Sequence, residues 1–193
     1  MMLVPYDPSW AAEFSDIEAV LAGALRERIL RIEHVGGTAI PGLRAKPILD
    51  IDVVIAGYEV FPAVVDVLRG LGYAHNGDQG IEEREAFNRE DAFTPWSEPR
   101  KSWMTHHLYV CPTHGEELRR HVKFRDALRV RDDLRGEYEE MKLSIESRAN
   151  GDRKIYAQIK EIECREFVEK VLRMDLMPEP DVIRRRGARF LRG

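Results

Sequence analysis

Two aspartates lie one residue apart in the clearest strand pattern of the chain, the segment ILDIDVVIA that follows Pro47. Side chains of a strand alternate between its two faces. One face is therefore apolar and suits a core: Leu49, Ile51, Val53 and Ile55. Asp50 and Asp52 share the opposite face, about 6.6 Å apart along the strand. Neighbouring carboxylates repel each other, so the pair needs solvent, a basic partner or a cation. Mg²⁺ or Mn²⁺ meets this need, since Mg²⁺ typically binds a few carboxylates together with phosphate oxygens.

A glycine turn, Gly36-Gly37-Thr38, lies shortly before this strand. Glycines let the backbone approach a phosphate closely, and successive amides form an anion-binding nest. Thr38 adds a hydroxyl and can open a helical turn whose amides point at the ligand. The alternative is an ordinary tight turn. Together, the turn and the carboxylates suit phosphate chemistry, in which the turn holds a triphosphate and the metal neutralises charge on the reacting phosphorus. Lys46 can add a phosphate contact or lie exposed.

The elements that position these residues follow from hydrophobic spacing. Asp7 and Pro8 begin a helix whose apolar face is Trp10, Phe14, Ile17, Leu21 and Leu25. Further patterns predict strands over 28–35, after Pro47 and over 107–110, a helix over 59–71, and short strands with long loops in 73–104. Two helical stretches, 115–149 and 153–174, complete the chain. This order predicts an α/β (α+β) fold with a small mixed sheet, flanking helices and C-terminal helices.

Composition sets the class of protein. With 44% hydrophobic and 33% charged residues, the chain suits a globular protein rather than a disordered one. It has no apolar run near the ~20 residues of a membrane span and no signal-peptide pattern, so we expect a cytoplasmic protein without membrane contact. Cys111 and Cys164 form no CxxC pair and are expected to be buried thiols.

Charge is unevenly distributed along the chain. Residues 181–193 carry five arginines and one aspartate, a net +4, so the other 180 residues carry −8 within the total of −4. An acidic body argues against general nucleic-acid binding. The basic tail can contact phosphate or pair with acids of the body. We therefore divide the chain into a domain over 1–175 and a basic tail over 176–193.

The two motifs resemble the signature of the GrpB family. The similarity is most specific from His34 to Leu43 and from Ala45 to Asp52, and it runs from about residue 4 to 170. Weaker matches lie at 6–10, 107–110, 124–129 and 137–142. The resemblance implies a fold of the nucleotidyltransferase superfamily. In some proteins a domain of this family is joined to dephospho-CoA kinase, which points to nucleotide metabolism.

Two departures from the family pattern concern the site. The family motif usually has serine where this chain has Gly37. Active nucleotidyltransferases also use a third carboxylate on a neighbouring strand, and the resemblance places the acid-free segment 107–110 there. With Leu108 and Val110 in the core, His107 and Tyr109 share the open side with the aspartates. His107 is then a metal ligand, an acid–base group or a strand-edge histidine.

Other charged residues rank lower as site candidates. Arg84 and Arg89 lie where the family has basic residues, and we place them below Lys46 as binders of substrate anions. His106, His114 and His121 lack zinc-site spacing and are interpreted as ordinary polar residues.

Three functions fit these observations. The first is a metal-dependent transferase that moves a nucleotidyl or phosphoryl group from a nucleoside triphosphate to an unknown acceptor. The second is a catalytically inactive nucleotide-binding module, which the missing carboxylate favours. The third is an interaction protein that docks a partner through its C-terminal helices or tail.

Overall fold

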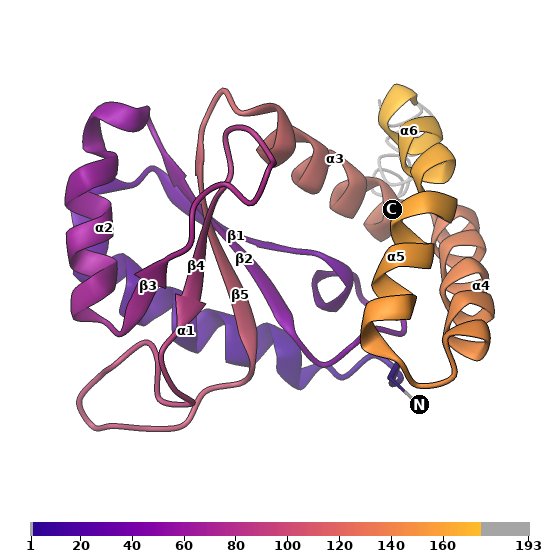
Figure 1. The fold of residues 1–193 in the computed structure, drawn as a ribbon, viewed down its shortest axis with the longest axis horizontal. Coiled ribbons are helices and arrows are strands. Elements are labelled where there is room, and N and C mark those ends of the chain that lie inside the picture. Colours follow the sequence, from indigo (N-terminus) through magenta and orange to yellow (C-terminus); the bar gives the residue numbers. More distant parts are fainter. Residues whose placement is uncertain (1, 175–193) are drawn as a thin grey trace, which may run out of the picture.

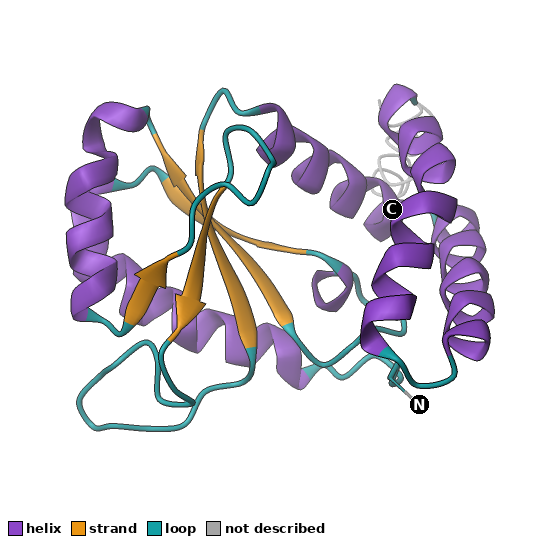
Figure 2. Ribbon diagram, viewed as in Figure 1, coloured by secondary structure: helices purple, strands orange, loops and turns teal. Residues whose placement is uncertain are grey.

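A computed structural model describes residues 2–174 of the chain. Its centre is a five-stranded sheet in the order β1-β2-β5-β4-β3, in which β2 and β5 run parallel and the other neighbours run antiparallel. The strands are β1 (Arg31–Val35), β2 (Leu49–Ile55), β3 (Tyr73–His75), β4 (Glu85–Arg89) and β5 (His106–Pro112). The predicted mixed α/β fold is thus confirmed (Figure 2).

Six α-helices accompany the sheet within the described residues. They are α1 (Ser9–Leu25), α2 (Phe61–Gly70), α3 (Glu116–Val130), α4 (Asp132–Ala149), α5 (Arg153–Glu163) and α6 (Arg165–Arg173). Figure 1 shows α4, α5 and α6 grouped to one side of the sheet. No helix in residues 2–174 combines the length and the apolar composition needed to cross a membrane.

One face of the sheet forms the main core with α1 and α2. The predicted apolar stripe of α1 is buried at Trp10, Ile17, Leu21 and Leu25. The predicted apolar face of β2 is fully buried in the same core. Leu108 and Val110 of β5 join it, as expected from strand alternation. This confirms which face of β2 is inside.

The opposite face is partly covered by α3. A small cluster of Val54, Cys111 and Leu118 packs this helix onto β2 and β5. The far end of α3 belongs to a second core, which α4, α5 and α6 share with residues near the N-terminus and after the glycine turn. The open face of β2 therefore lies between α3 and the C-terminal helices. Both cysteines are buried thiols, as predicted.

Several boundaries differ from the sequence-based expectation. The helical stretch 115–149 is broken at Arg131, which is extended at φ −117° and whose guanidinium pairs with Asp133 in the first turn of α4. The stretch 153–174 is likewise broken, at Cys164. Strand β1 begins three residues late, because Arg26 (φ +49°) leads into a short 3₁₀ turn. The basic tail over 176–193 lies outside the described residues.

Candidate functional site

The two aspartates of β2 lie at the middle of the sheet, on the face turned away from the main core. Strand pairing sets Asp50 opposite His107 of β5 and Asp52 opposite Tyr109. On the other side, Asp52 pairs with Glu33 of β1. The predicted arrangement of Asp50, Asp52, His107 and Tyr109 on one face is therefore confirmed.

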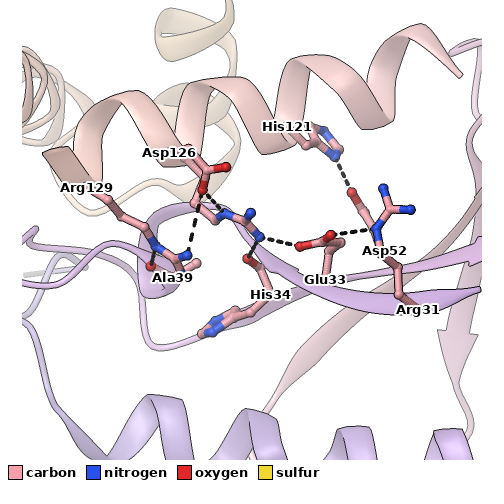
Figure 3. A network of polar contacts seen from close by, with 9 residues as sticks. Arg31, Glu33, His34, Ala39, Asp52, His121, Asp126 and Arg129 are labelled. Carbon is pink, nitrogen blue, oxygen red and sulfur yellow. Dashed lines mark hydrogen bonds and ion pairs between the residues drawn. The ribbon is translucent and has the colours of Figure 1, made fainter. Parts of the chain in front are cut away.

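Asp52 is fully buried beneath α3. Its Oδ2 accepts a hydrogen bond of 2.8 Å from Nδ1 of His121 (Figure 3). Nε2 of the same ring lies 3.1 Å from Glu117 Oε1. An imidazole that donates to two carboxylates carries a proton on both nitrogens. Burial alone would lower the pKa of His121, but the bonds to Asp52 and Glu117 raise it to about 10. His121 is thus a cation at neutral pH, and its interpretation as an ordinary polar residue was wrong.

The second oxygen of Asp52 has a different environment. Oδ1 is buried and has no hydrogen-bond partner among the described residues. A buried, unpaired carboxylate oxygen costs free energy unless a donor or a cation reaches it. Oδ1 of Asp52 is therefore suited to bind a cation. Taken alone, residues 2–174 contain no group of three or more His, Cys, Asp or Glu side chains placed to hold a metal ion.

Asp50 lies against the glycine turn and is only half-buried. A Cβ added at Gly36 would stand 2.0 Å from Asp50 Oδ2, and the φ of +70° at Gly36 is one that other residues rarely adopt. Glycine is thus required for this close approach. Burial raises the pKa of Asp50, while His107, Lys160 and His121 act in the opposite direction. Within the described chain, its carboxylate accepts no hydrogen bond.

The glycine turn continues as a 3₁₀ turn over Gly37–Ala39. The amides of Ala39 and Ile40 bond back to Gly36 and Gly37, as in the first turn of a helix. The amides of Gly37 and Thr38 find no acceptor in residues 2–174. A serine at position 37, as in the family motif, would bring its Cβ to 3.0 Å from that of Ala45. Ala45 therefore leaves little room for a side chain at position 37.

Thr38 does not offer its hydroxyl to a ligand. The side chain is buried, its Oγ1 lies 3.0 Å from His34 Nε2, and it donates to the carbonyl of Ile48. The predicted phosphate contact by this hydroxyl is therefore corrected, because both bonds serve to hold the turn against β1 and β2. Only the backbone amide of Thr38 remains for an anion.

Arginines of α3 fix this helix and the turn relative to β1 (Figure 3). Arg125 is almost fully buried and bonds to Glu33 Oε2 at 2.6 Å and to the carbonyl of His34 at 2.9 Å. Arg129 donates to the carbonyl of Ala39 at 2.8 Å. Because charge-assisted bonds to backbone carbonyls are directional, they set how α3 crosses the sheet. That crossing brings His121 to Asp52.

The remaining candidates occupy different places. His107 is exposed, opposite Asp50. Arg84 stacks over the ring of Tyr109 at 4.5 Å, on the side of the aspartates. Arg89 is instead bonded to the carbonyls of Met104, Ala92 and Trp103, so it holds the loop before β5 and is not placed to bind an anion. His106 is buried and bonds to Tyr73 and Met104, as a structural histidine does.

Lys46 lies half-buried before β2, with its ammonium 4.1 Å from the centre of the Tyr156 ring. It lines a groove of about 180 Å³ together with Met2, Pro47, Ile48, Thr105 and Arg153. Two further lysines, Lys142 and Lys160, approach the same region from α4 and α5.

Sequence reasoning missed His121 and these two lysines. His121 and Glu117 are four residues apart and share one helix face, which is a visible signal. This spacing points to a functional site only once α3 is known to pack over Asp50 and Asp52.

Comparison with known proteins identifies the family of the chain. The family model described as GrpB protein matches residues 1–173. The chain is 34% identical over 170 residues to a UPF0157 protein of Pseudomonas aeruginosa, covering 88% of this chain and 65% of that protein. It is 28% identical over 184 residues to a dephospho-CoA kinase of Mycolicibacterium paratuberculosis, covering 82% of this chain and 43% of the kinase. The chain therefore spans less than two thirds of either relative.

A solved structure of a GrpB protein shares the fold. The crystal structure of conserved protein GrpB from Enterococcus faecalis superimposes with a TM-score of 0.72 at 24% identity, over 88% of this chain and 96% of that one. A structure of Cid1 with its short product ApU aligns with a TM-score of 0.49 at 12% identity, over 76% of this chain and 42% of Cid1. On the strength of the family model, which spans all the described elements, the chain belongs to the GrpB family.

Proposed function

We propose that this protein is a metal-dependent transferase that moves a nucleotidyl or phosphoryl group from a nucleoside triphosphate to an acceptor. One observation carries the proposal: Asp50 and Asp52 share a face, and the buried Oδ1 of Asp52 lacks a partner among the described residues. The Gly37 and Thr38 amides lie beside them. Carboxylates next to unpaired amides suit a ligand that combines a cation with an anion.

Each residue has a definable role in this reaction. Asp50 and Asp52 would hold Mg²⁺ or Mn²⁺, which neutralises charge on the phosphates when bound. The Gly37 and Thr38 amides bind phosphate oxygens. His121 is a positioning residue, since its two bonds fix the Asp52 carboxylate. An oxygen of the acceptor bonds to phosphorus, the bond to the leaving phosphate oxygen breaks, and the exposed His107 takes the proton of the acceptor hydroxyl.

Calorimetric titration with Mg²⁺ or Mn²⁺ and a set of nucleoside triphosphates tests the proposal. The wild type should bind, and Asp50→Asn/Asp52→Asn should lose binding. Asp66→Asn/Asp78→Asn is the matched control, because both of these acids are exposed and the charge change is equal. Equal nucleotide affinity in the wild type and the Asp50/Asp52 double variant would defeat the proposal.

A binding module without catalysis is the second candidate. Strand β5 presents His107 and Tyr109 to the aspartates and carries no third carboxylate. Two carboxylates suffice to bind a metal–nucleotide complex, while the usual transferase uses three. This candidate predicts nucleotide binding without release of pyrophosphate for any acceptor tested. Turnover that disappears in Asp52→Asn would rule it out.

A further inference from the structure

Three lysines from separate segments meet beside the glycine turn. Lys142 of α4 places its Nζ 3.5 Å from where a Cβ of Gly37 would stand. Lys160 of α5 faces Asp50 and the phenols of Tyr138 and Tyr156. Lys46 lies over the other end of the same region, on the ring of Tyr156. The C-terminal helices thus deliver positive charge to the open side of Asp50.

Lys142 is unusual because it is only 4% exposed. Lysines are almost never fully buried unless they are paired. Its ammonium donates to the carbonyl of Arg44 and lies 5.4 Å from the centre of the Tyr138 ring. A lysine has three donors, so one carbonyl leaves it under-satisfied. Throughout residues 2–174, no carboxylate comes within 4.0 Å of Lys46, Lys142 or Lys160.

The three lysines also repel one another. Burial is the main cause that lowers the pKa of Lys142 to about 7; Lys160 and Lys46 lower it further, and Glu139 acts in the opposite direction. The pKa of Lys160 itself is raised, by Tyr138 first and also by Tyr156 and Asp50. The pKa of Lys46 is lowered by burial, then by Lys160 and Arg153. Bringing like charges together at a partly buried position does not stabilise the folded protein. An anion between them would offset the repulsion.

We propose that Lys142, Lys160 and Lys46 form a polyphosphate-binding subsite, which holds the phosphate chain of the substrate between the glycine turn and helices α4 and α5. The inference rests on the proposed function and extends it, since it assigns the binding of the phosphates to the helical part of the chain. Gly37 lies next to Lys142, and the amides of Gly37 and Thr38 have no acceptor in residues 2–174. The groove beside Lys46, which Arg153 also lines, continues it.

A phosphate chain fits better than a single carboxylate. The lysines come from three segments, with Lys142 beside Gly37 and Lys46 over Tyr156, so their charges are spread out rather than gathered at one point. Lysine binds phosphate as a point charge, so several lysines suit a chain of several charges. Asp50 at the inner end would repel a bare anion, and a cation shared between Asp50 and the phosphates removes that repulsion.

Binding of inorganic tripolyphosphate without metal, measured by calorimetry in the presence of a chelator, tests the subsite. The wild type should bind it, and Lys142→Met and Lys160→Met should each weaken binding at least tenfold. Lys154→Met is the matched control: it is the same substitution at an exposed lysine of α5 and should change affinity less than twofold. Asp50→Asn should tighten metal-free binding, because it removes a repelling charge.

The subsite and the proposed function fail on different results. Absence of tripolyphosphate binding by the wild type, or equal affinities for the Lys142, Lys160 and Lys154 variants, overturns the subsite. If Lys142→Met does not fold, the affinities of Lys160→Met and Lys46→Met for tripolyphosphate test the subsite instead. Both of these side chains are only half-buried, so their replacement should be tolerated by the fold. The transferase proposal instead fails if the affinity for metal and nucleotide is unchanged in the Asp50→Asn/Asp52→Asn variant. Titrations with ATP and UTP then show whether a nucleoside adds affinity beyond the phosphate chain.

Discussion

Asp50 and Asp52 stand two residues apart on one strand, yet the protein surrounds them differently. Asp52 is fully buried, and one oxygen is held by protonated His121. Asp50 is half-buried, accepts no hydrogen bond from the described residues and lies against Gly36. The difference follows from α3, which sends His121 to Asp52 and leaves Asp50 to the turn and α5. One carboxylate is fixed by the fold, and the other is left available.

Gly36→Ala should have the largest effect, through the clash with Asp50 and through backbone strain. The new Cβ would stand 2.8 Å from Asp50 Cγ and closer to Oδ2, at a φ of +70°. Strain and clash together should lower the free energy of unfolding by about 3 kcal/mol in urea denaturation. Gly70→Ala is the control, because a Cβ there meets no atom within 4 Å and should be neutral or stabilising.

A double-mutant cycle assigns this cost. An Asp50→Ala background removes the two closest atoms, Oδ2 and Cγ, and leaves Cβ at 3.0 Å. Gly36→Ala should then cost mainly the backbone term, about 1 kcal/mol. If the cost is the same in both backgrounds, Asp50 does not occupy the space beside Gly36.

Asp52→Asn should destabilise the metal-free protein by about 2 kcal/mol. The change leaves the charged His121 with Glu117 as its only carboxylate partner. Breaking a buried ion pair costs about 3–5 kcal/mol, and the partial exposure of His121 reduces this. Urea denaturation at neutral pH gives the value. Asp133→Asn, which breaks an exposed pair with Arg131, should cost far less than Asp52→Asn. Equal losses in the two variants would contradict the buried pair.

Sequence pattern predicted the Asp50–Asp52 strand better than the surroundings of either residue. Alternation along β2 and β5 depends on local geometry, so it determined which side chains share the open face. The buried stripe of α1 was predictable for the same reason. The use of Thr38 was not, because its bonds to His34 and Ile48 depend on how β1 and β2 meet the turn.

Long-range packing decided the rest of the site. His121 and Lys142 lie 69 or more positions after Asp52 in the sequence. Their spacing within their helices does not indicate which part of the sheet those helices cover. The break at Arg131, which turns α4 back toward the glycine turn, was hidden in a stretch of continuous helical periodicity. Charge patterns on helices are typical of solvated faces, and a buried lysine among them has the same spacing as an exposed one.

The lysines beside Asp50 predict a pH dependence of stability. The pKa of Lys142 is lowered to about 7, while an unfolded lysine titrates near 10.4. Between these values the unfolded state binds more protons, so stability should rise with pH. From pH 7 to 8.5 this contribution is about 1.6 kcal/mol, and Lys142→Met should remove it.

Denaturation of both proteins at each pH isolates the contribution of Lys142. The groups that face it are Lys160 and Cys164 from the last helices, Glu139 on α4 and Lys46 before β2. All of them remain in the variant, so they largely cancel in the difference. A wild-type curve parallel to that of Lys142→Met would show that Lys142 keeps an ordinary pKa.

Asp50→Asn should have the smallest effect, and its sign should be opposite to that of Asp52→Asn. The substitution removes a half-buried charge that has no hydrogen-bond donor in residues 2–174. It gives up the attraction to His107, Lys160 and His121 and relieves the repulsion from Asp52. The metal-free variant should therefore equal or exceed the wild type in stability, by less than about 1 kcal/mol. With Mg²⁺ and a nucleotide the order should reverse, because a ligand that binds the native wild type raises its melting temperature and leaves the variant unchanged. Thermal denaturation of both proteins in the two conditions gives the four values. A metal-free loss as large as that of Asp52→Asn would mean that Asp50 is also held by the fold, and the contrast between the two carboxylates would disappear.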